Sequence, residues 1–410
     1  MRKLVVCCDG TWNTPRTETN VFRTYDFLRT SLGLPDEVRW KDGVRTSAGR
    51  ARDGSEVLLF YDQGVGTNWY ERLAGGALGI GLSENVRDAY HFLGHAMTAG
   101  SEIYVFGFSR GAYTARSLCG FIEAAGLLAQ PSEADVWRAY MAHYVARQRV
   151  VARPRGWSLD RARDRVRRVA GEMIERFGGP AVDGLTRHDG VLIRFVGVYD
   201  TVGALGVPLP DALEINDPIV GFHDTSLCDV VEHAVHALAV DERRGPYMPT
   251  LWTESGDAPL EARRSVLQVW FPGVHSDIGG GYRDKGIGDI TLDFMLRQAA
   301  RRGLVVDPDQ ATPNLTLRPL PPQHESFDAK WTALCERLHI LPAGVRSIGT
   351  TVPGPDGDPL TVLGEARLHP AVLTRIGQPC VTILDEERGT EREGEYRPLN
   401  VTANNLPPFG

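Results

Sequence analysis

The segment around Ser109 combines residue types and spacing that suit a nucleophilic serine. Ser109 stands in Gly107-Phe-Ser-Arg-Gly111, directly after the apolar run 103–106. On a nucleophile elbow, the sharp turn that joins a strand to a helix, the residues flanking the serine must be small, and Gly107 and Gly111 meet that need. A serine at the start of a helix also lies where the helix dipole favours developing negative charge. We therefore predict that Ser109 is the nucleophile of a hydrolase.

Histidines that follow the serine along the chain are the candidates for its base. A nucleophilic serine needs a base to take its proton, and in hydrolases with this elbow the chain order is Ser, then Asp or Glu, then His. His275 comes soon after the apolar run 266–271, and the glycines behind it suit a loop that approaches a substrate. His369 lies in an irregular tail and is a weaker candidate, and His236 stands inside an apolar run typical of a core strand. We predict His275 as the base.

Two aspartates compete for the role of the acid that orients the base. Asp200 ends the apolar run 192–199, and Asp241 ends the next run, 235–240. Strand order alone slightly favours Asp241, the later of the two. Asp241 is followed by one acidic and two basic residues, which indicates a salt-bridged turn, whereas Asp200 has no cation beside it in the sequence. That setting suits a buried partner for an imidazolium, so we predict Asp200, with Asp241 as the alternative.

The loop Asp9-Gly-Thr-Trp-Asn13 is predicted to help hold the oxyanion. In hydrolases with this elbow, one backbone N–H comes from the residue after the nucleophile and another from a loop that follows an earlier strand. We expect Arg110 and either Thr11 or Trp12 to be these donors. An apolar strand before Asp-Gly-Thr also occurs in aspartyl-phosphate phosphatases, but those enzymes need a nucleophilic Asp two residues earlier, where this chain has Cys7. We therefore exclude that reading.

The rest of the sequence gives no sign of a metal, a cofactor or nucleic acid. The six cysteines form no CxxC pair, so we expect no metal site. The glycine-rich segments 61–67 and 75–81 fit neither a phosphate-binding loop nor a dinucleotide fingerprint, so we expect no cofactor. A net charge of −7 argues against nucleic-acid binding, which draws its affinity from basic residues.

The sequence also carries no predicted membrane anchor or leader. No stretch approaches the roughly 20 apolar residues that a membrane-spanning helix needs. The first apolar run ends at Asp9, which is too early for a secretory signal. We expect a cytoplasmic protein, which a specialised secretion system could export.

Short, nearly continuous apolar runs separated by helical patterns must position these residues. Such runs are typical of strands buried on both faces of a parallel sheet, and they cover 4–8, 57–61, 103–106, 192–199, 235–240 and 266–271. Apolar residues at helical spacing fill 86–97, 112–122 and 292–300, the first with Ser83 as its N-cap and Gly100 as its stop. This alternation predicts a doubly wound, mostly parallel α/β domain over 1–304.

Two regions depart from the alternation. Residues 129–190 are helical in pattern, with nine arginines between Arg147 and Arg168. They lie between two core strands and are predicted to form an insertion, either a solvated helical pair or a lid over the site. Residues 305–410 are rich in proline and glycine, and we expect an irregular, partly β extension packed on the core.

Several motifs, taken together and in order, resemble the DUF2235 family, the catalytic domain of the Tle1-type phospholipase effectors of type VI secretion. The resemblance covers nearly the whole chain and implies an α/β-hydrolase fold with a Ser–Asp–His triad. Carried over by motif, that triad is Ser109, Asp200 and His275. The motifs are Asp-Gly-Thr-Trp-Asn, Tyr-Asp-x-Gly-Val-Gly-Thr, Gly-Phe-Ser-Arg-Gly-Ala-Tyr-Thr-Ala-Arg, Gly-Val-Tyr-Asp-Thr-Val-Gly, Trp-Phe-Pro-Gly-Val-His-Ser-Asp-Ile-Gly-Gly-Gly-Tyr and Tyr396-Arg-Pro-Leu-Asn400.

These residues predict a serine-dependent carboxylic-ester hydrolase, and the resemblance implies that it is of the lipase or phospholipase A type. Its substrate would be an ester or a phospholipid, reached through peripheral contact with a membrane surface, and the sequence names no protein partner. The alternative from a different class is a catalytically silent α/β-hydrolase scaffold that acts as a binding or secretion-associated module. Covalent labelling of Ser109 distinguishes the two.

Overall fold

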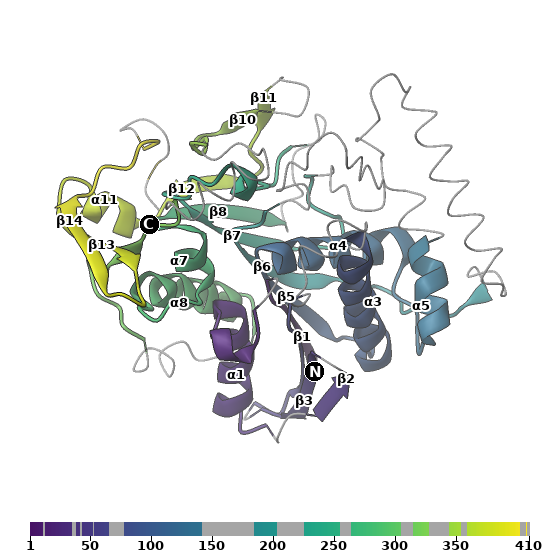
Figure 1. The fold of residues 1–410 in the computed structure, drawn as a ribbon. Coiled ribbons are helices and arrows are strands. Elements are labelled where there is room, and N and C mark those ends of the chain that lie inside the picture. Colours follow the sequence, from purple (N-terminus) through teal and green to yellow (C-terminus); the bar gives the residue numbers. More distant parts are fainter. Residues whose placement is uncertain are drawn as a thin grey trace.

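A nine-stranded sheet forms the centre of the molecule (Figure 1), in the order β12-β8-β7-β6-β5-β1-β4-β3-β2. The computed structural model describes residues 1–10, 13–34, 38–41, 43–51, 53–64, 78–141, 184–202, 225–254, 264–304, 315–327, 344–353, 359–401 and 407. Within them the sheet strands are β1 (Arg2–Cys8), β2 (Val38–Lys41), β3 (Val44–Arg50), β4 (Glu56–Asp62), β5 (Glu102–Phe108), β6 (Ile193–Tyr199), β7 (His233–Ala239), β8 (Ser265–Phe271) and β12 (Glu365–Leu368).

Neighbouring strands pair in parallel from β12 to β4, and only β3 and β2 at one edge are antiparallel. Each of the apolar runs expected to be strands is one of these parallel strands, namely β1, β4, β5, β6, β7 or β8. All seven residues of β7 are buried, as a strand covered on both faces requires. The predicted α/β-hydrolase-like, mostly parallel fold is confirmed.

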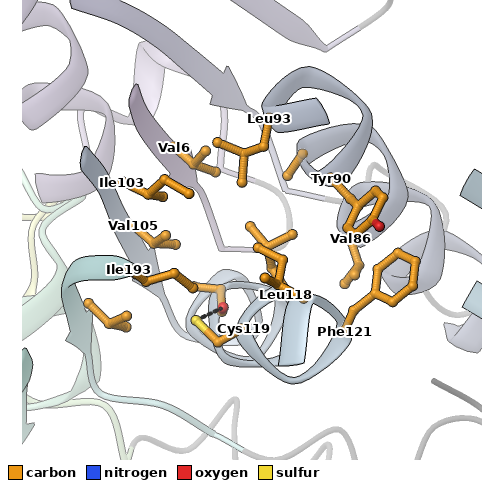
Figure 2. Close-up of a cluster of buried hydrophobic side chains, with 14 of the residues drawn as sticks. Val6, Val86, Tyr90, Leu93, Ile103, Val105, Leu118, Cys119, Phe121 and Ile193 are labelled. Carbon is orange, nitrogen blue, oxygen red and sulfur yellow. Dashed lines mark hydrogen bonds between the residues drawn. The ribbon is translucent and has the colours of Figure 1, made fainter. Parts of the chain in front are cut away.

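Helices cover both faces of the sheet. Alternate strand residues point to opposite faces, and on both faces these residues are apolar. On one face, Val6, Ile103 and Val105 meet side chains of α3 (Leu78–Ala96) and α4 (Arg110–Ala125), as Figure 2 shows. Short α5 (Glu133–Ala139) packs against α3 on that side. On the other face, Val5 and Cys7 belong to a core with α1 (Asn20–Ser31) and α8 (Gly286–Arg301). The short α7 (His275–Gly279) packs against α8.

Helix α3 begins earlier than the sequence indicated. Its first residue is Leu78, so Ser83 lies inside the helix and its expected role as N-cap is wrong. Gly79 and Gly81 lie inside this helix, where a glycine costs only about 1 kcal/mol relative to alanine and is tolerated. The helix ends at Ala96, before a turn in which Gly100 adopts φ +75°.

The chain beyond residue 304 extends the central sheet. Strand β12 adds to it beside β8, and Leu368 and Tyr396 share a core with Leu238 and Trp270 of the central strands. The remaining elements here are β9 (Gln323–His324), β10 (Thr351–Pro353), β11 (Pro359–Thr361), α11 (Pro370–Arg375), β13 (Pro379–Asp385) and β14 (Thr390–Glu395). In Figure 1 the yellow β13, β14 and α11 lie beside the green α7 and α8.

Part of what the sequence predicted lies outside the described residues. This holds for 142–183, which includes the arginine-rich part of the predicted insertion, and for 65–77, which includes parts of both glycine-rich segments. Among the described helices, none has both the length and the apolar character needed to cross a membrane.

Candidate active site

Ser109 occupies a sharp turn between β5 and α4. Its backbone has φ 56° and ψ −120°, a combination that is costly for any residue other than glycine. The Ser109 N–H donates to the carbonyl of Tyr199 at 3.0 Å, so the end of β6 holds the turn in place. Such strain persists only where the surrounding structure imposes it, and it is concentrated at functional sites.

The two elbow glycines allow three backbone segments to approach each other. A Cβ atom on Gly107 would lie 2.5 Å from the carbonyl oxygen of Gly111. A Cβ atom on Gly111 would lie 2.2 Å from the carbonyl oxygen of Cys8 and 2.4 Å from that of Asp9. No side chain fits at either position, because all the opposing atoms belong to the backbone. The turn that presents Ser109 therefore depends on both glycines.

The structure brings Ser109, His275 and Asp200 together at one edge of the sheet. They follow β5, β8 and β6, whose carboxyl ends lie side by side because the strands are parallel. His275 Nε2 lies 2.8 Å from Ser109 Oγ, and His275 Nδ1 lies 2.5 Å from Asp200 Oδ2. An ionised carboxylate only accepts, so Nδ1 carries the proton, and in the neutral ring Nε2 accepts from the serine hydroxyl. This arrangement allows His275 to remove the Ser109 proton.

His275 is enclosed by aromatic rings. The ring of Tyr247, in the short helix η4 (Gly245–Tyr247), meets it edge-on with centroids 5.0 Å apart, and the ring of Phe108 lies at 4.7 Å. Its backbone N–H donates to Glu242 Oε2 at 3.2 Å. Burial lowers the pKa of His275 below its ordinary value, although Asp200 opposes that shift. The ring is therefore neutral, as a general base must be, in neutral solution.

Asp200 is completely buried and accepts hydrogen bonds on both oxygens. Oδ1 accepts from the Ala239 N–H at 3.0 Å, and the Arg346 guanidinium donates to Oδ1 at 2.6 Å and to Oδ2 at 2.9 Å. Burial by itself would raise the pKa of the Asp200 carboxyl, but Arg346 and His275 together hold it well below its usual range. Asp200 is therefore an anion at any pH at which the protein would work.

Arg346 corrects one premise of the sequence argument. Asp200 was favoured partly because no cation lies beside it in the sequence. The guanidinium of Arg346, which lies 146 residues further along the chain, nevertheless binds its carboxylate. Sequence reasoning missed Arg346, which stands in a segment without a strand or helical pattern. No local signal identifies it.

Asp241, the alternative acid, has other partners. It accepts from the Gly273 N–H at 2.6 Å and from the Tyr396 hydroxyl at 2.9 Å. Burial raises its pKa to about 6. The salt-bridged turn expected after it is present, since Arg244 binds the buried Glu242 at 2.9 Å. Asp241 is therefore placed to tie the β7 end to the loop after β8 and to the C-terminal part of the chain.

The other two histidines weighed as bases have structural surroundings. His236 is buried in β7, accepts the Thr201 N–H on Nε2 at 3.0 Å, and burial lowers its pKa to about 3. His369 caps α11 and stacks on Phe271 with ring centroids 4.3 Å apart, and burial lowers its pKa to about 4. Both pack among core residues of the sheet and its C-terminal edge.

Of the two expected oxyanion donors, only Arg110 is described. It opens the sixteen-residue helix α4, and burial lowers the pKa of its guanidinium to about 10. Thr11, like Trp12, lies outside the described residues. Gly10 just before them approaches the serine, because a Cβ atom on Gly10 would lie 3.3 Å from Ser109 Cβ. Within the described ranges, no group of three or more His, Cys, Asp or Glu residues could hold a metal ion.

Comparison with known proteins finds a family model that covers most of the chain. Residues 2–298 match the model of a family described as T6SS, Phospholipase effector Tle1-like, catalytic domain. The chain is 26% identical over 279 residues to the uncharacterized protein YEL023C of Saccharomyces cerevisiae, an overlap of 62% of this chain and 34% of that protein. The chain thus spans about a third of the length of this curated relative.

Solved structures with some likeness are also longer than this chain. One is an uncharacterized protein from Pseudomonas aeruginosa, with 18% identity and a TM-score of 0.39 over 74% of this chain and 46% of that one. Another is the Tle1 effector bound to the VgrG spike of the type 6 secretion system, with 17% identity and a TM-score of 0.34 over 70% of this chain and 52% of the other.

Proposed function

The chain belongs to the family of Tle1-like phospholipase effector catalytic domains of type VI secretion, and on that basis we propose that it is a serine-dependent carboxylic-ester hydrolase of the lipase or phospholipase A type. The observation that carries the proposal is the hydrogen-bonded series Ser109–His275–Asp200. The family supports a phospholipid substrate. The serine, base and acid support cleavage at an acyl ester, because in a Ser-His-Asp triad the serine attacks a carbonyl carbon and forms an acyl-enzyme.

In the first half of the reaction the acyl group moves to the enzyme. Ser109 Oγ attacks the ester carbonyl carbon while His275 Nε2 takes the serine proton, and the carbonyl electron pair moves onto oxygen. The tetrahedral intermediate collapses, the bond to the alcohol oxygen breaks, and the leaving alcohol takes the proton from His275. Asp200 remains ionised throughout and stabilises the imidazolium that forms between the two proton transfers.

In the second half, water replaces the alcohol. His275 takes a proton from a water molecule whose oxygen attacks the acyl carbon on Ser109. Collapse of this second intermediate breaks the bond to Oγ, which recovers its proton from His275, and the carboxylic acid leaves. The sum is one ester bond hydrolysed by one water, with the enzyme returned to its starting state.

The oxyanion of both intermediates needs donors that are already in place. The Arg110 N–H at the first turn of α4 is the first donor in this proposal, supported by its position directly after Ser109. The second donor in this proposal is the N–H of Thr11, supported by the position of the preceding Gly10 beside the serine. Removal of one such donor typically costs 10²–10³ in turnover, as an order of magnitude.

The proposal extends to organisation and location. In this proposal residues 1–304 form the catalytic domain, which includes the helical insertion 129–190, and residues 305–410 form an extension packed on the core. The enzyme is made in the cytoplasm and exported by a specialised secretion system, and it meets phospholipid through peripheral contact with a membrane surface. Family membership supports the export route and the lipid substrate.

A fluorophosphonate probe tests the nucleophile directly. The wild type should be labelled once, at Ser109, and should release fatty acid from phospholipid vesicles and hydrolyse a short soluble ester. Ser109→Ala should lose the label and lower both rates by several orders of magnitude, because the triad acts as a unit. Ser117→Ala is the matched control, since Ser117 is another buried serine of α4 that lies two turns beyond Ser109.

Two results would overturn the proposal. An unlabelled, inactive wild type would indicate the catalytically silent scaffold. A Ser109→Ala variant that keeps more than about a tenth of the wild-type rate would mean that another residue is the nucleophile.

A further inference from the structure

Arg346 is the one cation that contacts Asp200 among the described residues, and it is fully buried. Its two terminal nitrogens bind both carboxylate oxygens, Nη1 to Oδ1 and Nη2 to Oδ2. A guanidinium that binds a carboxylate through two parallel hydrogen bonds fixes the plane of that carboxylate, which a lysine cannot do. The plane matters here because Oδ2 also receives His275 Nδ1–H.

The same guanidinium ties the carboxylate to its surroundings. Nη1 also donates to the Ala239 carbonyl at 2.9 Å, and Nη2 donates to the Tyr247 carbonyl at 2.5 Å. Ala239 supplies the N–H that binds Asp200 Oδ1, and the ring of Tyr247 packs edge-on against His275. Arg346 therefore joins the orienting acid, the end of β7 and the aromatic wall of the base.

The position of Arg346 is itself secured by a motif that the catalytic residues do not use. Asn400, in the segment Tyr396-Arg-Pro-Leu-Asn400, donates to the Arg346 carbonyl and to the Val240 carbonyl, each at 3.1 Å. Both Arg346 and Asn400 lie beyond residue 298, where the family match ends. The two guanidinium hydrogen bonds to Asp200 thus come from outside the matched catalytic domain.

We propose that Arg346 is a positioning residue of the ester-hydrolysing site, through which the C-terminal part of the chain completes the Ser109–His275–Asp200 triad. This inference rests on the proposed function. Arg346 does not reach the serine and takes no proton. It acts through Asp200, whose backbone is held at φ +42° and whose carboxylate it keeps in the orientation that binds His275 Nδ1–H.

Arg346 also sets the charge balance at the base. The charged groups around His275 are Asp200 and Glu242, which are negative, and Arg244 and Arg346, which are positive. Glu242 and Arg244 bind each other, and Asp277 on the same short helix as His275 is paired with His324 at 2.6 Å. Burial lowers the pKa of His275 and Asp200 opposes that shift, so the charge on the ring also depends on how strongly Asp200 interacts with the imidazole rather than with the guanidinium.

Arg346 and His275 both interact with Asp200, and this determines the direction in which removal of Arg346 shifts the pKa of His275. His275 must be neutral to accept the Ser109 proton, so kcat/KM falls when the pH drops below the pKa of His275. Without Arg346, Asp200 would stabilise the protonated imidazole alone, and the pKa of His275 would rise. The acidic limb of the pH profile should then move to higher pH.

Arg346→Met and Arg375→Met form the decisive pair of variants. Arg375 is the other fully buried arginine among the described residues beyond 304, and it donates to the Pro321 carbonyl at 2.6 Å instead of contacting the triad. Arg346→Met should lower kcat on a short soluble ester by about tenfold to a hundredfold, with KM little changed. It should also move the acidic limb of kcat/KM up by roughly one pH unit. Arg375→Met should leave that limb where it is.

Arg346→Lys separates charge from geometry and covers the case in which Arg346→Met does not fold. Lysine keeps the positive charge but cannot bind both carboxylate oxygens and both carbonyls. The acidic limb should stay near its wild-type position while kcat still falls by about tenfold or more. An undiminished kcat in this variant, or equal limb shifts in the Arg346 and Arg375 methionine variants, would overturn the inference. Failure of the proposed function looks different, because the wild type itself would then show neither labelling nor hydrolysis.

Discussion

At the residue scale, Asp200 is where the catalytic and the structural demands meet. Its carboxylate orients His275 and also neutralises the buried Arg346. Removing one member of a buried ion pair costs about 3–5 kcal/mol, because the other charge is left without compensation. A substitution at Asp200 should therefore affect both turnover and stability.

Asp200→Asn should lower turnover by up to about 10⁴, because an amide favours the wrong histidine tautomer. It should also lower the free energy of unfolding by several kcal/mol, since Arg346 loses its counterion. Turnover of a short ester, measured well below the unfolding temperature, separates the two effects. Asp241→Asn serves as the control and should keep most of the wild-type turnover, because Asp241 binds Gly273 and Tyr396. The reverse order of the two variants would assign the acid to Asp241.

At the scale of elements, the elbow depends on how closely α4 approaches β1. The carbonyls of Cys8 and Asp9 at the end of β1 occupy the space that a side chain at position 111 would need. The end of β1, the elbow and the start of α4 are therefore in close backbone contact beside Ser109.

Gly111→Ala should destabilise the protein by at least about 1–3 kcal/mol, the usual cost of overpacking, because the new methyl group meets backbone that cannot rotate away. Turnover should also fall, since relief of the clash moves Ser109 away from His275. The matched control is Gly394→Ala, where the added methyl group has no neighbouring atom within 4 Å. Urea unfolding and ester turnover of the two variants measure both effects. Equal stabilities for the two alanine variants would contradict the close approach of helix and strand.

At the scale of the whole molecule, buried carboxyls with opposite pKa shifts contribute to the way the free energy of unfolding varies with pH. Arg244 lowers the pKa of Glu242 to about 2 against the effect of burial, so its contribution is present above pH 4.5 and is lost as the pH falls towards 2. Burial raises the pKa of both Asp9 and Asp241 to about 6. Their folded forms hold protons more tightly than the unfolded chain, so the stability they give is present below pH 3.8 and is lost as the pH rises through 6.

We expect Asp241→Asn to change the difference in the free energy of unfolding between pH 5 and pH 7.5, so that as the pH rises between these values the variant loses less stability than the wild type, or gains more. A rise from the ordinary value of 3.8 to about 6 corresponds to about 3 kcal/mol between full protonation and full ionisation. Asparagine has no proton to lose, so this share of the pH dependence should disappear. Urea unfolding at the two pH values measures it. If the free energies of unfolding at the two pH values differed by the same amount in the variant and the wild type, ionisation of Asp241 would not be a cause of lost stability.

The sequence by itself determined the sheet, the family and the position of the elbow. Strands buried on both faces must be continuously apolar, which made β1, β4, β5, β6, β7 and β8 readable as short runs. The elbow is a local motif, since Gly107, Ser109 and Gly111 are all needed within one turn. The ordered motifs identified the family because they extend over most of the chain. The start of α3 was predicted wrongly, because the helix begins at Leu78 and includes two glycines in its first turn, whereas Ser83 was expected to be its N-cap.

Only the tertiary structure decided which groups surround His275. Asp200 and Asp241 both end core strands, and their carboxylates differ in what meets them in space: Arg346 and His275 at the first, Gly273 and Tyr396 at the second. Arg346 lies 146 residues from Asp200 along the chain. Asn400 donates to the carbonyls of both Arg346 and Val240, and so ties the segment that carries Arg346 to the end of β7. Such a contact leaves no pattern in the sequence, because neither its partner nor its burial depends on neighbouring residues.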